Sequence, residues 1–147
     1  MDNILSVLVF FPAIAGLLGF VVEKESARAY GITVAAIELF LSLWLWFSFD
    51  SANAGMQFVE VIPLIPDFGV SYYLGVDGIS LFIIVMAALM TLIGMMSMSI
   101  TENIKNMIIT LLFLEMTMIG VFVALDAIIF YLFWELSLVP MLYIIGA

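Results

Sequence analysis

The chain has 147 residues, of which 67% are hydrophobic and only 10% are charged. Soluble domains are closer to half apolar and a quarter charged, so this composition indicates an integral membrane protein rather than a soluble domain. The formal net charge is −9, from 3 basic and 12 acidic residues, and the chain has no histidine and no cysteine. Because iron–sulfur clusters, most haem groups and the common zinc sites need these ligands, we expect no metal and no redox cofactor in this chain.

Five apolar runs are each long enough to cross a hydrocarbon core of ~30 Å, which requires about 20 residues. These predicted spans cover residues 3–22, 30–49, 78–100, 106–125 and 127–147. We therefore predict a single all-α integral membrane domain with five transmembrane helices. Asp2 stands where a secretory signal would be basic, so the first run is interpreted as a retained span.

The loop over residues 50–77 has short β-branched and aromatic runs on both sides of the turn sequence IPDFG (65–69). This pattern predicts a short β-hairpin, roughly 58–62 paired with 70–75. Asp77 directly precedes the third span and is expected to cap its N-terminus. Four aromatic residues are expected to lie at the membrane interface near this loop: Trp44, Trp46, Tyr72 and Tyr73.

The basic residues predict the orientation of the spans. Lys24 and Arg28 lie between the first two spans, and Lys105 lies between the third and fourth. With five alternating spans these two loops are on one side of the membrane, and the positive-inside rule places that side in the cytoplasm. The N-terminus, the loop 50–77 and the turn at Asp126 are then predicted to face outward.

Three glutamates, Glu38, Glu115 and Glu135, lie near the middle of predicted spans. A charged acid at the centre of a span costs about 2.5–3.5 kcal/mol on insertion scales, so such residues normally face a bundle interior or a wet cavity. Each acid is either a neutral group bonded to a backbone carbonyl or a group that carries protons. For Glu38 both interpretations stay open, with Ser42 as its only polar neighbour one turn on.

Glu135 stands out through its local sequence, FYLFWELSLVPMLY (130–143). Pro140 has no N–H, so the carbonyl of Leu136 loses its intrahelical partner, and Ser137 adds a hydroxyl nearby. Because unpaired backbone groups in hydrocarbon must be satisfied by protein or water, this site favours an internal water and a titrating proton. The alternative is a packing kink at the proline beside a passive acid. No lysine or arginine lies within any predicted span to pair with the acid.

Three segments, GVDGISLF (75–82), IGVFVALD (119–126) and FYLFWELSLVPMLYIIGA (130–147), resemble the antiporter-like subunit M, or chain 4, of respiratory complex I. That enzyme is the proton-pumping NADH–quinone oxidoreductase. The resemblance covers essentially the whole chain, including the acidic outer loop. Members of this family have about fourteen helices with two inverted repeats of five. The resemblance therefore implies an N-terminal fragment, which would not translocate protons by itself.

The resemblance also implies roles and partners. Glu135 would be the proton-transfer acid of the first half-channel, acting on a lysine of a later helix; Glu115 is a secondary candidate, and Glu38 is not carried over. NADH, FMN, iron–sulfur clusters and quinone would bind to partner subunits. Other membrane subunits of complex I, including homologous antiporter-like ones, would contact this chain in the bacterial plasma membrane, and no nucleic-acid partner is expected.

Two alternatives to this function remain. The chain could be part of a subunit of a multisubunit cation/proton antiporter or a membrane-bound hydrogenase, because these proteins share the fold. It could also be a passive helical scaffold, whose acids would tolerate replacement by amides.

Overall fold

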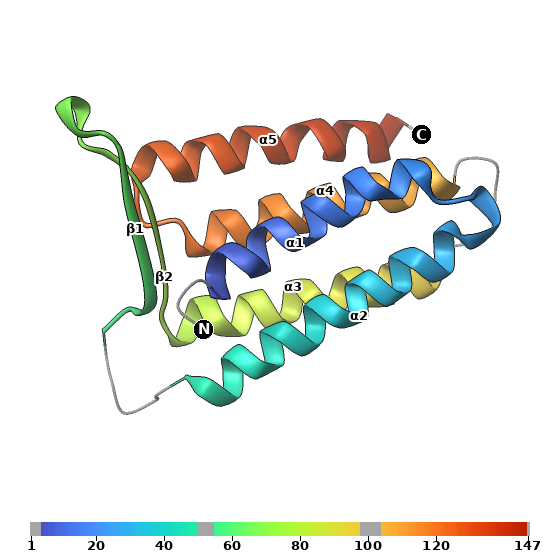
Figure 1. Ribbon diagram of the computed structural model, residues 1–147, viewed down its shortest axis with the longest axis horizontal. Coiled ribbons are helices and arrows are strands. Elements are labelled where there is room, and N and C mark those ends of the chain that lie inside the picture. Colours follow the sequence, from blue (N-terminus) through green and yellow to red (C-terminus); the bar gives the residue numbers. More distant parts are fainter. Residues whose placement is uncertain (1–3, 50–54, 98–103, 147) are drawn as a thin grey trace.

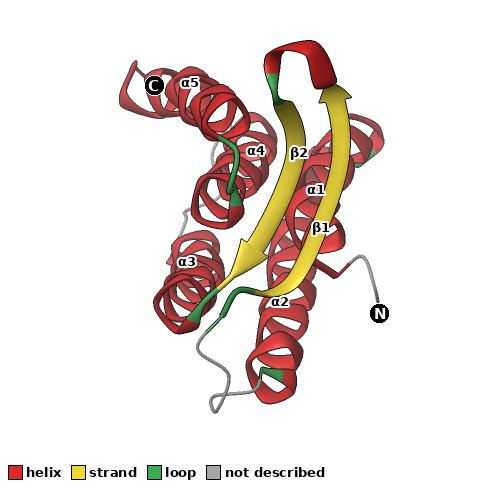
Figure 2. Cartoon of the chain, turned by 90° about the vertical axis from the view of Figure 1, so that its left-hand side faces the viewer, coloured by secondary structure: helices red, strands yellow, loops and turns green. Residues whose placement is uncertain are grey.

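The computed structural model describes residues 4–49, 55–97 and 104–146. In this part of the chain five α-helices lie side by side, and a two-stranded antiparallel sheet crosses one end of the group (Figures 1 and 2). All five helices are long and apolar enough to cross a membrane, which confirms the predicted all-α membrane fold with a hairpin. The helices are α1 (Ile4–Leu18), α2 (Lys24–Ser48), α3 (Gly78–Ser97), α4 (Ile104–Val123) and α5 (Ala127–Gly146), and the 3₁₀ turn η1 (Gly19–Val21) follows α1.

α2 begins at Lys24 rather than at residue 30, where the apolar run starts. The added residues are mostly polar but include good helix formers, and Glu25 in the first turn interacts favourably with the positive end of the helix dipole. Lys24 and Arg28 therefore belong to α2 instead of a loop, and Lys105 lies in the first turn of α4. All three basic residues remain at helix ends. The last residues of the predicted third span, 98–100, lie outside the described part of the chain.

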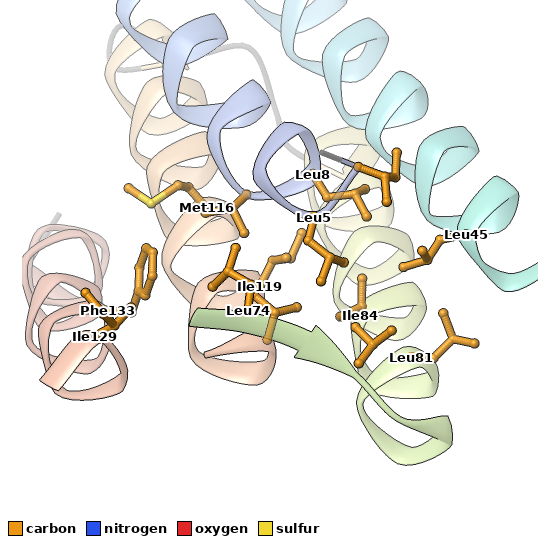
Figure 3. Packing of buried hydrophobic residues seen from close by; sticks show 14 of the residues in the cluster. Leu5, Leu8, Leu45, Leu74, Leu81, Ile84, Met116, Ile119, Ile129 and Phe133 are labelled. Atoms are coloured by element: carbon orange, nitrogen blue, oxygen red, sulfur yellow. The ribbon is translucent and has the colours of Figure 1, made fainter. Parts of the chain in front are cut away.

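α4 is the centre of the packing, because it contacts each of the other four helices and also the hairpin. Residues three or four positions apart share one face of a helix, and the buried stripe of α4 has this spacing. The stripe includes Ile104, Ile108, Leu112, Glu115, Ile119 and Val123. At the hairpin end, side chains from every helix and from the hairpin meet in one apolar cluster, which includes Leu5, Leu45, Leu74, Ile84, Ile119 and Phe133 (Figure 3).

The hairpin is present and extends beyond the predicted residues. β1 (Gln57–Ile65) pairs antiparallel with β2 (Val70–Val76), and the 3₁₀ turn η2 (Pro66–Phe68) joins them. Gly69 follows this turn with φ +70°, a conformation that glycine adopts without the steric penalty of a side chain. β2 also pairs with the α4–α5 connection, where the Leu125 N–H donates to the Tyr73 carbonyl over 2.8 Å. The hairpin is thus fixed to the helices through β2.

Three acidic side chains bind helix N-termini at the hairpin end. Glu60 of β1 accepts hydrogen bonds from the first turn of α1, Asp77 from the Ser80 N–H of α3 over 2.8 Å, and Asp126 from the first turn of α5. Asp126 also accepts a bond of 3.0 Å from the Ser71 N–H of β2. The expected cap at Asp77 is therefore confirmed. The hydrogen bond from Ser80 holds the pKa of Asp77 below its usual range, and the bond from Ser71 does the same for the pKa of Asp126.

Basic side chains bind carbonyl groups at the opposite end of the bundle. Arg28 donates to the Met96 carbonyl near the end of α3 over 2.5 Å, and Lys105 donates to the Phe20 carbonyl after α1 over 2.7 Å. Because the C-terminal end of a helix carries partial negative charge, cations are favoured there and anions at the other end. The charge pattern of the sequence thus matches the dipoles of the odd-numbered helices.

Of the four aromatic residues expected at the hairpin end, two make contacts with other aromatic rings. Tyr72 of β2 stacks on Phe10 of α1 with ring centroids 6.3 Å apart, and Trp46 near the end of α2 faces Phe82 of α3 at 6.5 Å. Trp44 and Tyr73 remain partly exposed.

Candidate functional site

Glu115 lies within the buried stripe of α4. Leu112 precedes it by three residues and Ile119 follows it by four, and the solvent-exposed fraction of all three side chains is 0%. Because residues at this spacing share a helix face, the acid points in the same direction as the apolar stripe. The structure therefore places Glu115 inside the bundle, as a mid-span acid is expected to lie.

Glu38 occupies the equivalent position on α2. Its buried neighbours on that face are Val34, Ala35, Ser42 and Leu45, and its own side chain is 0% exposed. Ser42 lies one turn away, but its hydroxyl donates to the Leu39 carbonyl of its own helix over 2.7 Å. Ser42, the polar neighbour that the sequence predicted for Glu38, therefore does not donate a hydrogen bond to it.

Glu38 and Glu115 are buried on α2 and α4, two helices that pack against each other, and they lie within range of each other's charge. Thr91 of α3 is the polar neighbour of Glu115, but its hydroxyl donates to the Ala87 carbonyl over 2.9 Å. None of the four carboxyl oxygens of the two acids has a hydrogen-bond partner among the described residues. The sequence identified both acids but missed Thr91, whose only signal is a single polar residue in the middle of an apolar span.

Glu135 has a different environment from the other two acids. The buried residues of α5 are Ile129, Phe133 and Pro140, which share one face of that helix. At about 100° per residue, Glu135 lies ~140° around the helix from this face. It is exposed and makes no hydrogen bond with the described residues, because α5 packs mainly against α4 and leaves its outer face uncovered. The structure therefore does not bring Glu135 together with Glu115 or Glu38.

Pro140 does not interrupt α5, which runs unbroken from Ala127 to Gly146. The proline is buried beside a groove of about 350 Å³ between α4 and α5, whose walls include Thr110, Thr117 and Tyr143. Ser137 donates to the Trp134 carbonyl over 2.6 Å, so its hydroxyl is not directed to Glu135 as a donor. The sequence placed acid and proline close together, whereas the helix puts them on different faces.

The three acids lie at a similar distance from the hairpin end of the bundle. Glu38 is ten residues before the end of α2 at Ser48, Glu115 is eight before the end of α4, and Glu135 is eight after the start of α5. At a rise of 1.5 Å per residue these separations are about 12–15 Å. Within the described ranges, no group of three or more acidic side chains could hold a metal ion. The three acids thus lie at a similar depth along the bundle.

These features define a class: a polytopic α-helical membrane protein with acids at the centre of its helices. Comparison with known proteins gives the relationship. The chain is 42% identical to NADH-quinone oxidoreductase subunit M of Rhodobacter capsulatus and 36% identical to NADH-ubiquinone oxidoreductase chain 4 of Marchantia polymorpha, over 99% and 97% of its length. It is 35% identical, over 99% of its length, to F(420)H(2) dehydrogenase subunit M of Methanosarcina mazei. No protein-family model matches the sequence.

Solved structures agree with these matches. The fold superimposes on a chain of respiratory complex I from Thermus thermophilus with a TM-score of 0.78 and 26% identity, over 92% of this chain and 27% of that one. A chain of an archaeal membrane-bound sulfane sulfur reductase matches with a TM-score of 0.76 and 23% identity, over 94% of this chain and 22% of that one. The chain is thus a homologue of the subunit M and chain 4 proteins, as the sequence motifs predicted, and spans about 30% of the length of these curated relatives.

Proposed function

We propose that the chain is part of an antiporter-like membrane subunit of an NADH–quinone oxidoreductase, where it takes part in proton translocation coupled to quinone reduction. The observation that carries this proposal is the similarity along 97–99% of the chain to proteins named as subunit M or chain 4 of that enzyme. The similar Thermus thermophilus chain belongs to a respiratory complex I with bound NADH. In the proposed assembly NADH, FMN, iron–sulfur clusters and quinone bind to other subunits.

In this proposal Glu135 is the proton-transfer acid. It lies near the middle of a membrane-length helix, on a face of α5 that the described residues leave uncovered. Since the curated relatives are about three times longer than this chain, further helices would cover that face and supply a basic partner. A carboxyl group in such a position binds a proton when the partner's charge moves away and releases it when the charge returns.

Glu115 is proposed as a secondary proton-carrying residue. It is fully buried inside the bundle, so it cannot contact a partner from the outer face of α5. Its contribution would instead involve α2 and α3, whose side chains surround it.

The bundle is proposed to lie in the bacterial plasma membrane with the hairpin outside and the ends near Lys24, Arg28 and Lys105 in the cytoplasm. The hydrogen bonds of Arg28 and Lys105 at the end opposite the hairpin support this orientation.

A second candidate differs in the electron donor. The similarity to F(420)H(2) dehydrogenase subunit M, at 35% identity, favours a related membrane complex that accepts electrons from another carrier. In either case this chain would perform the same proton-transfer task, because the donor binds to other subunits.

The proposal is tested by isolating the native complex through an affinity tag on the full-length subunit. We expect quinone reductase activity with NADH as donor and co-purification of iron–sulfur and homologous membrane subunits. Reduced F420 as the only effective donor would favour the second candidate. A complex without quinone reductase activity, containing only small antiporter-type subunits, would refute both.

A further inference from the structure

Glu115, the secondary proton carrier proposed above, shares the interior between α2 and α4 with a second buried acid, Glu38. Glu38 and Glu115 are each 0% exposed, and all four of their carboxyl oxygens lack a hydrogen-bond partner in the described part of the chain. A buried polar atom without a hydrogen bond is costly, and an unpaired buried charge is far more costly. The pair therefore requires a hydrogen-bond donor or a neutralising charge.

No described basic side chain is placed to supply that charge. Arg28 lies ten residues before Glu38 on α2, and Lys105 lies ten residues before Glu115 on α4, which is ~15 Å along each helix axis. Both side chains bind backbone carbonyls at that distant end, and Lys24 lies farther still from Glu38. α1 and α3 contain no charged residue, and Asp77, Asp126 and Glu60 are bound at the hairpin end.

The neighbouring hydroxyl groups do not supply the donor either. Ser42 donates to the Leu39 carbonyl, and Thr91 donates to the Ala87 carbonyl. Each hydroxyl has only one proton to donate, so its oxygen can only accept another bond. A protonated carboxyl group, in contrast, has an O–H donor. Within the described part of the chain, a proton on the acids themselves is thus the donor that remains for this site.

We propose that Glu38 and Glu115 form a carboxyl pair that holds at least one proton between α2 and α4, as a proton-binding site separate from Glu135. The protonated carboxyl donates its O–H to an oxygen of the other carboxyl group, directly or through one water molecule. Only O–H bonds form and break as the proton moves between the two groups. Two carboxylates that share a site of low dielectric constant do not both remain ionised, so the last proton stays on the pair.

The first test measures protonation by infrared spectroscopy of the complex with the full-length subunit in lipid, comparing wild type with Glu38→Gln and Glu115→Gln. We expect the C=O absorption of the protonated pair to change in both variants, because each substitution removes one acid and alters the surroundings of the proton on the other. Glu25→Gln is the matched control, because Glu25 is an exposed acid at the start of the same helix as Glu38. It should change no such band. Loss of ionised carboxylate bands only, or a Glu115 band unaffected by Glu38→Gln, would overturn the proposal.

A second test uses assembly of the complex and does not depend on any infrared band. Glu38→Leu and Glu115→Leu each leave the other acid alone in apolar surroundings, whereas the double variant removes both. We expect the double variant to assemble, on native gels, to a greater extent than either single variant. Losses that simply multiply in the double variant would overturn the pairing. Both tests report on the pair itself and stand whether or not the complex pumps protons.

Discussion

The contact between the hairpin and the start of α1 allows a stability prediction for Glu60→Gln. Glu60 Oε2 accepts hydrogen bonds from the Leu5 N–H at 2.9 Å and the Ser6 N–H at 3.1 Å, and Oε1 accepts one from the Ser6 hydroxyl. Leu5 and Ser6 are in the first turn of α1, whose N–H groups have no partner within the helix. The carboxylate therefore caps α1 from a residue 54 positions away in the sequence.

The magnitude follows from the geometry of this cap. Hydrogen bonds to a charged group contribute about 1.5–3 kcal/mol, and an anion at a helix N-terminus contributes about 0.3–1 kcal/mol. Glutamine keeps a neutral oxygen that still accepts one of the N–H bonds, so we expect a loss of about 1–2 kcal/mol. Because 1.36 kcal/mol corresponds to a factor of ten, the population with a detached hairpin would increase about 5- to 30-fold. Glu60 is only 8% exposed, so solvent screens little of this effect.

Hydrogen–deuterium exchange of the complex measures this population directly. Peptides from the start of α1 and from the hairpin should exchange faster in Glu60→Gln by the same factor, while the middle of α4 should not change. Asp67→Asn is the matched control, since Asp67 is an exposed acid at the tip of the same hairpin. Unchanged exchange at Leu5 and Ser6 in Glu60→Gln, or an equal increase in the control, would refute the capping argument.

Two further predictions concern α5 and its connection. At Gly120 a Cβ atom would overlap the ring of Phe133, whereas at Gly94 it would meet nothing within 4 Å. Gly120→Ala should therefore separate α4 from α5 and lower the free energy of unfolding by about 1–3 kcal/mol. Thermal unfolding in detergent would measure this loss, and a Gly94→Ala variant of equally low stability would contradict the explanation. The hydrogen bond from Ser71, together with those from α5, holds the pKa of Asp126 below its usual range. The carboxylate therefore stabilises the fold above the unfolded pKa of about 3.9, and this stabilisation is lost as the pH falls through the lower folded pKa. Hydrogen–deuterium exchange in β2, corrected for the intrinsic rate, should thus be constant from neutral pH to about pH 4 and become faster below it. Asp126→Asn should show the faster exchange already at neutral pH. Wild-type exchange that becomes faster from near pH 6 would disprove the assignment.

Most of the fold could be predicted from the sequence because a helix that crosses a membrane must be long and apolar. Spans of about 20 apolar residues mark the helices, and the Asp77 cap and the IPDFG turn depend on short-range chemistry that sequence spacing reveals. The start of α2 was placed too late, since its polar residues form helix beyond the apolar run. Contacts such as Glu60 with α1 join residues far apart in the chain, and no local pattern encodes them.

The directions of the acids could not be predicted in the same way. Glu135 and Ser137 of α5 lie about 160° apart around an otherwise apolar helix, so the sequence has no polar face to indicate which side packs inward. Whether Glu135 faces the other helices depends on how α5 packs on α4, which only the structure defines. The meeting of Glu38 with Glu115 likewise depends on the rotation of α2 and α4 about their axes.

Proton pumping by a Glu135→Gln variant tests the central claim most directly. The complex with the full-length subunit would be placed in sealed vesicles, and the initial rate of proton uptake on addition of electron donor would be followed with a pH-sensitive dye. Quinone reductase activity and native gels would confirm assembly, and Glu135→Asp would serve as the control that keeps a carboxyl group. We predict that the assembled Glu135→Gln complex loses most of its proton uptake while Glu135→Asp keeps a measurable part. Wild-type proton uptake by a fully assembled Glu135→Gln complex would contradict the role assigned to this acid.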